Sequence, residues 1–197
     1  MDQPTVREQR QPFVSDVQEL HGRAHRHMEE GAVTSAYAAD RETVLRILND
    51  VLATEIICVL RYKRHYYMAT GIHAQSVAEE FLQHAQEEQA HADFVAERIT
   101  QLGGEPNFNP DGMTSRSHSE YSGGKTLLDM VREDLVAERV AVESYNEIIR
   151  YLGSDDPTTR RMLETIMAKE EEHADDMKKI LDNLRENLRP EKSAREA

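Results

Sequence analysis

The sequence predicts an all-α protein, a four-helix bundle with one long crossover between its second and third helices and an N-terminal extension. Three observations predict this fold. Four long segments carry apolar side chains at alternating steps of three and four residues, the pattern of a helix that buries one face. Glycine and proline cluster between these segments instead of interrupting them. The connections after the first and third segments are short, whereas the connection after the second is long.

We expect the four helices over residues 40–69, 73–102, 125–152 and 157–188. Gly71 and Gly153 mark tight connections, so each pair of helices that they join should be antiparallel neighbours. Residues 104–124 are long enough to return along a helix to its other end. Asp156 is the expected N-cap of the last helix because Pro157 follows it at the first helical position. The expected organisation is an N-terminal arm at 1–39, partly helical or flexible, a bundle at 40–188 and a polar tail at 189–197.

Composition limits the classes of function. Apolar residues make up 39% of the 197 residues, which is enough to build one core. The formal net charge of -13 argues against a nucleic-acid partner, because contacts to phosphate need a basic surface. Cys58 is the only cysteine, which excludes an intrachain disulfide and a cysteine-based metal cluster. Residues 1–19 lack the apolar run of a secretion signal and no stretch is apolar enough to span a membrane, so we expect a cytoplasmic protein without a membrane partner.

A glutamate interrupts each apolar seam near its middle. Two of these glutamates begin Glu-x-x-His tetrads, so an imidazole lies one turn further along the same helix face. A charged carboxylate that faces a bundle core is costly unless it is paired or holds a metal. In each hairpin the two glutamates lie nearly equally far from the connecting glycine, which places them at the same level. The sequence therefore predicts a metal site inside the bundle, with the ligands Glu55, Glu88, His91, Glu138, Glu170 and His173.

Four carboxylates and two imidazoles form the ligand set of the di-iron and di-manganese carboxylate bundles. Oxygen-rich ligation with one imidazole per ion suits iron, with manganese as the alternative metal. Both tetrad glutamates, Glu88 and Glu170, are the expected bridges between two ions. The expected assignment gives one ion mainly to Glu55, Glu88 and His91 and the other mainly to Glu138, Glu170 and His173.

Other polar residues near these ligands allow two interpretations each. Tyr62 lies two turns beyond Glu55 on the same seam and is either a core aromatic or a redox-active tyrosine beside the metals. His84 lies one turn before Glu88 and is either a core histidine or a partner of the metal ligands. Asp134 is either a surface acid or an outer carboxylate that orients a ligand histidine. Three acidic residues fall off the seams and are interpreted as solvated surface: Glu87, Glu171 and Glu172.

With these residues the chain resembles the ferritin-like superfamily, and the bacterioferritins most closely. The resemblance covers residues 40–184 and rests on the six expected ligands, on Tyr62 seven residues after the first glutamate, and on the Gly-Gly-Glu-Pro turn at 103–106. It implies a ferroxidase with two Fe ions per subunit, which oxidises Fe(II) with O2 or peroxide for iron storage or detoxification and has Tyr62 as a catalytic residue. It also implies a homo-oligomer, from a dimer up to a hollow cage.

The chain also departs from the bacterioferritins. They bind haem through a methionine directly after the glutamate of the first tetrad, and Gln89 occupies that position here, so we expect no haem. The tail after Leu184 has no apolar fifth helix, which weakens the expectation of a 24-subunit cage. The Dps proteins match less well, because their metal site lies between subunits.

Two other classes of function use the same bundle. A dinuclear manganese or iron enzyme, either a manganese catalase or peroxidase or a di-iron oxygenase, would use the same six ligands. A structural or partner-binding bundle would use the metal only to stabilise the fold. Metal preference and oligomer size separate these alternatives from a ferroxidase.

Overall fold

A computed structural model describes residues 15–72 and 74–187 of the chain. Over these residues the protein is helical and contains no β-strand. The chain divides into two compact units, Met1–Tyr37 and Ala38–Ala197. Residues 1–14 of the expected arm and the expected polar tail at 189–197 lie outside the described residues.

The described part of the first unit contains one short helix, α1 (Val17–Ala24), and one 3-10 turn, η1 (Met28–Glu30). Asp16 caps α1, because its Oδ1 accepts hydrogen bonds from the backbone N–H groups of Gln18 at 2.9 Å and Glu19 at 3.0 Å. The helix contributes no buried residue. Three histidines of this unit have exposed side chains: His21, His25 and His27.

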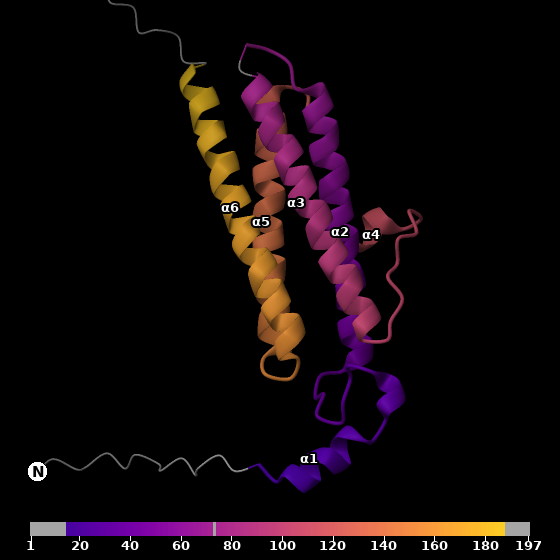
Figure 1. Cartoon of the computed structure of the whole chain (residues 1–197). Helices are drawn as coiled ribbons and strands as arrows, with labels where there is room; N and C mark the ends of the chain where they lie inside the picture. Colours follow the sequence, from indigo (N-terminus) through magenta and orange to yellow (C-terminus); the bar gives the residue numbers. More distant parts are fainter. Residues whose placement is uncertain (1–14, 73, 188–197) are drawn as a thin grey trace, which may run out of the picture. The chain divides into compact units, whose positions relative to one another are not determined.

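Four long helices form the second unit: α2 (Arg41–Met68), α3 (Ala74–Gln101), α5 (Leu127–Leu152) and α6 (Pro157–Asn187). They run side by side, and α2 packs on α3 while α5 packs on α6 (Figure 1). The predicted four-helix bundle with a long crossover is therefore confirmed, and each observed helix begins and ends within a few residues of its predicted bounds.

Local sequence signals begin and end these helices. Thr126 and Asp129 form a capping box at the start of α5, in which each side chain accepts a hydrogen bond from the backbone N–H of the other residue at 3.1 Å. Asp156 is the N-cap of α6, as predicted, and accepts a hydrogen bond from the backbone N–H of Thr159 at 2.9 Å. Gly153 ends α5 with a φ of 49°, a conformation that glycine adopts without a steric cost.

The crossover from α3 to α5 is not featureless, because it contains the short helix α4 (Met113–Arg116), which the sequence analysis did not predict. The segment lies along α2 (Figure 1). Asn49 accepts a hydrogen bond from the backbone N–H of Asn107 at 2.7 Å, and Thr54 accepts one from the backbone N–H of His118 at 2.9 Å. Side chains of α2 therefore hold the crossover in place.

The apolar seams of the four helices meet in the middle of the bundle. One cluster takes a fully buried side chain from each long helix: Tyr62, Phe81, Val131 and Met177. This cluster lies two helical turns from the seam glutamates and closes the bundle core on that side of them. Among the described residues, no helix combines the length and the apolar character needed to cross a membrane.

Candidate metal centre

The structure brings the six predicted ligands together at the middle of the bundle. All of them are buried, and Glu138 is the most buried with no exposed surface. α2 and α5 contribute one glutamate each, whereas α3 and α6 contribute one Glu-x-x-His tetrad each. We call this cluster the metal centre; its members are Glu55, Glu88, His91, Glu138, Glu170 and His173.

Ligand atoms of the metal centre form two overlapping groups, and the atoms within each group lie within 4.8 Å of one another. Glu88 and Glu170 belong to both groups. Carboxylates shared in this way can bridge two cations, and each group adds one further carboxylate and one imidazole. The first group is Glu55, Glu88, His91 and Glu170, and the second is Glu88, Glu138, Glu170 and His173.

Each member of the metal centre has one buried polar atom without a hydrogen-bond partner among the described residues. Nδ1 of His91 lies 2.8 Å from Oε1 of Glu170 and 3.4 Å from Oε2 of Glu55, yet neither contact has the alignment of a hydrogen bond. Nδ1 of His173 lies 3.2 Å from Oε1 of Glu88 in the same manner. Buried polar atoms are nearly always hydrogen-bonded. Six unpartnered atoms that converge on one space fit a pair of cations, and the donor set suits iron or manganese.

Burial and neighbouring charges shift the pKa values of the residues in the metal centre. Burial, followed by repulsion from the neighbouring Glu88, raises the pKa of Glu55 to about 8. Burial, followed by repulsion from Glu88, raises the pKa of Glu138 well above its usual range. Burial alone would lower the pKa values of His91 and His173, but the surrounding carboxylates raise them to about 12 and about 11. These groups hold protons at neutral pH, and a cation bound by them would displace those protons.

Two tyrosines connect the hairpins at the metal centre in a reciprocal way. The hydroxyl of Tyr62 on α2 donates to Oε1 of Glu138 on α5, and the hydroxyl of Tyr145 on α5 donates to Oε1 of Glu55 on α2. A role beside the metals was predicted for Tyr62 but not for Tyr145. The sequence contains a pattern that indicates both, because each tyrosine follows the glutamate of its own helix by seven residues.

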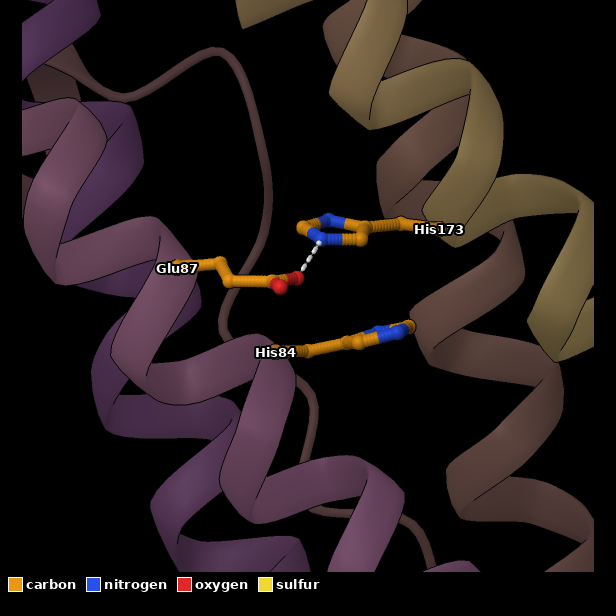
Figure 2. Close-up of side chains that lie close together, drawn as sticks. All are labelled: His84, Glu87 and His173. Atoms are coloured by element: carbon orange, nitrogen blue, oxygen red, sulfur yellow. Dashed lines mark hydrogen bonds and ion pairs between the residues drawn. The ribbon is translucent and has the colours of Figure 1, made fainter.

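Glu87 is not solvated surface, so that interpretation was wrong. Its Oε2 lies 2.7 Å from Nε2 of His173, in a hydrogen bond that joins α3 to α6 (Figure 2). A carboxylate on the far ring nitrogen fixes the orientation of an imidazole and leaves Nδ1 free for a ligand. Glu171 and Glu172 are exposed, as expected for the surface.

His84 lies beside the metal centre rather than in the apolar core alone. Its ring stacks on that of His173, with a centroid distance of 4.0 Å and an interplanar angle of 23° (Figure 2). Its Nδ1 lies 3.2 Å from the hydroxyl of Tyr62. Burial, followed by the nearby His173, lowers the pKa of His84 to about 3, so its imidazole is neutral. The histidine therefore contacts both a predicted ligand and the tyrosine that holds another.

Asp134 does not orient a predicted ligand histidine, and it is not a surface acid, because it has no exposed surface. It accepts a hydrogen bond from Nε of Arg61 at 2.9 Å and lies 2.8 Å from Nδ1 of His65. Arg61 also donates to Oγ of Ser119 in the crossover at 3.0 Å. We call Arg61, His65, Asp134 and Ser119 the crossover anchor. Periodicity could not reveal it, because its members lie on α2, on α5 and in the crossover and contact one another only in the folded bundle.

Comparisons with known proteins agree with this architecture. A family model described as a ferritin-like domain matches residues 45–187. Bacterioferritin BfrA of Mycobacterium tuberculosis is 30% identical over 154 residues, which are 74% of this chain and 89% of the relative.

Two solved structures extend the comparison. The dodecameric thioferritin of Bacteroides fragilis, a bacterioferritin-related protein, is 26% identical, with a TM-score of 0.73 over 78% of this chain and 94% of that one. The bacterioferritin of Desulfovibrio desulfuricans, which has a diiron site, is 25% identical, with a TM-score of 0.66 over 77% of this chain and 86% of that one. Because the family model spans most of the sequence, the chain belongs to the ferritin-like domain family.

Proposed function

We propose that the protein is a di-iron ferroxidase of the bacterioferritin type, which oxidises Fe(II) with O2 or peroxide for iron storage or detoxification. The observation that carries this proposal is the set of six buried ligand atoms without a hydrogen-bond partner at the metal centre. Fe(II) is the substrate in this reaction. Two Fe(II) ions together supply the two electrons that reduce O2 to hydrogen peroxide, or peroxide to water.

The proposed ligand assignment follows the two overlapping groups. Glu88 and Glu170 bridge the two ions, and each ion takes one further glutamate and one histidine. Four ionised carboxylates balance the charge of two divalent cations, so the loaded centre can be buried without a net charge. Glu87 keeps His173 oriented through its Nε2.

Tyr62 is the proposed redox-active residue. Its hydroxyl donates to Glu138, a proposed ligand, so a proton that leaves the phenol has a neighbouring carboxylate acceptor. Burial, followed by repulsion from Glu138, raises the pKa of Tyr62 well above its usual range, which keeps the phenol protonated at neutral pH. Tyr145 makes the equivalent contact to Glu55 only, and we assign it to positioning that ligand.

The proposed state of the protein is a cytoplasmic homo-oligomer, at least a dimer, without haem and without a nucleic-acid partner. A cage receives support from the relative of Bacteroides fragilis, whose name describes a dodecamer. Gln89 is exposed and donates to Asp93 at 3.1 Å, and an amide is not a haem ligand of the bacterioferritin type. The net charge of -13 favours cations over nucleic acid.

The test is to load apoprotein anaerobically with increasing Fe(II), admit O2, and count the iron oxidised and the iron retained per chain. We expect a fast phase of two irons per chain, the capacity of one dinuclear site, followed by slower uptake of many more into soluble protein. Saturation at two irons would instead favour the dinuclear enzyme considered above.

A variant and a control locate the reaction. The double substitution Glu88→Gln and Glu170→Gln keeps the shape of the bridging residues and removes their charge, so the fast phase should disappear. Glu171→Gln removes one exposed charge next to Glu170 and should leave the fast phase unchanged. Fast oxidation by the double variant at the wild-type rate would show that the reaction occurs elsewhere.

A further inference from the structure

A second cluster of ligand-type side chains lies outside the metal centre, between α3 and α6. Glu80 and His84 come from α3 and Asp176 comes from α6, and one ligand atom of each lies within 4.8 Å of the others. The side chain of His84 is 1% exposed, whereas those of Glu80 and Asp176 are 30% and 40% exposed. The cluster thus reaches from the buried ring of His84 to the surface.

The hydrogen bonds of Tyr62 fix the tautomer of His84. A cation bound in the metal centre would keep Glu138 ionised, and Tyr62 would then use its only proton to donate to that carboxylate. The contact between the Tyr62 hydroxyl and Nδ1 of His84 at 3.2 Å therefore requires Nδ1 to carry the proton of the neutral imidazole. Nε2 is left with a lone pair, the form in which histidine binds a metal.

That lone pair faces another acceptor. Nε2 of His84 lies 3.4 Å from Oε1 of Glu80, and Asp176 completes the group from the neighbouring helix. A lone pair and a carboxylate oxygen repel each other unless a proton or a cation lies between them. Among the described residues, the only basic side chain in an ion pair with Asp176 is Lys179, at 3.3 Å. Lys179 also forms an ion pair with Asp175, at 2.7 Å. Lys179 meets the cluster at its exposed edge and leaves Nε2 of His84 without a cation.

We propose that Glu80, His84 and Asp176 form a third divalent-cation site, directly outside the metal centre. One imidazole and two carboxylates suit Fe(II), Co(II) or Zn(II). The two partly exposed carboxylates have room to turn and close on an ion at about 2.0–2.2 Å, the usual distance for these ligands. Because the ring of His84 stacks on that of His173, an ion at this site lies one side chain away from the metal centre. The identification of the natural cation as Fe(II) rests on the proposed function.

The test is to count the Co(II) ions that the full chain binds by equilibrium dialysis at neutral pH, with excess Mg(II) present. Mg(II) prefers oxygen ligands and its own water shell, so it occupies exposed carboxylates without competing for imidazole sites. We expect three Co(II) per wild-type chain and two per chain of the double variant Glu80→Gln and Asp176→Asn. The control is Asp175→Asn, which removes one charge from the more exposed residue adjacent to Asp176 and should still bind three.

Each outcome separates this proposal from the proposed function. Two Co(II) per wild-type chain would overturn the third site and leave the metal centre intact. Three Co(II) in both the wild type and the double variant would also overturn it, because the third ion would then lie elsewhere. Binding of no Co(II) to the wild type would overturn both proposals. Anomalous diffraction from Co(II)-loaded crystals should place the third ion within bonding distance of Nε2 of His84.

Discussion

The crossover anchor and the metal centre are both clusters of buried polar side chains, and their hydrogen bonds differ. In the crossover anchor, both oxygens of Asp134 have a partner, and Arg61 joins α2 to α5 and to the crossover. In the metal centre, every member has a buried polar atom without a hydrogen-bond partner, and carboxylates lie close enough to repel one another. Both clusters include residues of α2 and α5, and all members of both clusters are buried.

This difference shows how a buried polar cluster that holds helices together can be distinguished from one that binds a ligand. A fully hydrogen-bonded cluster has no capacity left for a ligand, so its role is to hold elements together. A cluster with convergent unpartnered atoms is costly by itself, and its cost is offset only when a ligand binds. Burial and charge alone would have placed both clusters in one class.

The largest expected effect comes from breaking the crossover anchor. Asp134→Asn removes the charge that balances Arg61 and leaves a buried guanidinium unpaired, which should lower the free energy of unfolding by about 3–5 kcal/mol. Chemical denaturation monitored by circular dichroism measures this loss in the free energy of unfolding. The matched variant is Glu138→Gln in the metal centre, where a raised pKa already keeps the carboxyl protonated, so the change in the apoprotein should be below about 1 kcal/mol. Equal losses in the two variants would contradict the distinction.

The pH dependence of metal affinity tests the same comparison at the metal centre. At pH 7 the metal centre holds protons on His91, His173 and Glu55, whose pKa values of about 12, about 11 and about 8 are all raised. A cation must displace these protons, so affinity should rise with pH. If each of these three groups releases one proton when two Co(II) bind, the overall affinity for the pair of ions should increase by about 1000-fold between pH 6 and pH 7. An affinity that stays constant over this range would show that the protons are not on the ligands.

A smaller effect should follow from the carboxylate behind His173. Glu87→Gln weakens the hydrogen bond to Nε2 and frees the imidazole to rotate, which should reduce the affinity for one of the two ions by about 10-fold. Competition with a chromophoric chelator resolves the two binding steps. Glu172→Gln, an exposed residue adjacent to His173, serves as the control and should bind both ions as the wild type does. The prediction fails if both variants bind equally.

The smallest expected effect separates the two tyrosines. Tyr62→Phe and Tyr145→Phe each remove one hydrogen bond to a proposed ligand, so metal affinity should fall by a similar few-fold factor in both, as expected for about 1 kcal/mol. Only Tyr62→Phe should in addition slow Fe(II) oxidation once both ions are bound. Single-turnover stopped-flow absorbance measures this rate. Equal slowing in both variants would mean that Tyr62 is a positioning residue and not a redox-active one.

The sequence predicted the bundle well because one physical rule, burial of an apolar seam, governs all four helices. The same rule identified the seam glutamates as exceptions, and their nearly equal distances from Gly71 and Gly153 predicted that they lie at one level. Contacts between elements did not follow from periodicity. The partners of Asp134, Glu87 and Tyr145 lie on another helix. The crossover contacts α2 through backbone groups, which no sequence pattern predicts. The tetrads were visible because both of their members lie on one helix face.

The most direct test of the metal centre is anomalous diffraction from crystals loaded with Fe(II) under anaerobic conditions. We predict two ions about 3.5–4 Å apart, the separation typical of dinuclear sites. Glu88 and Glu170 should contact both ions, Glu55 and His91 one of them, and Glu138 and His173 the other. A single ion at this level, or two ions bound without either histidine, would contradict the proposed centre.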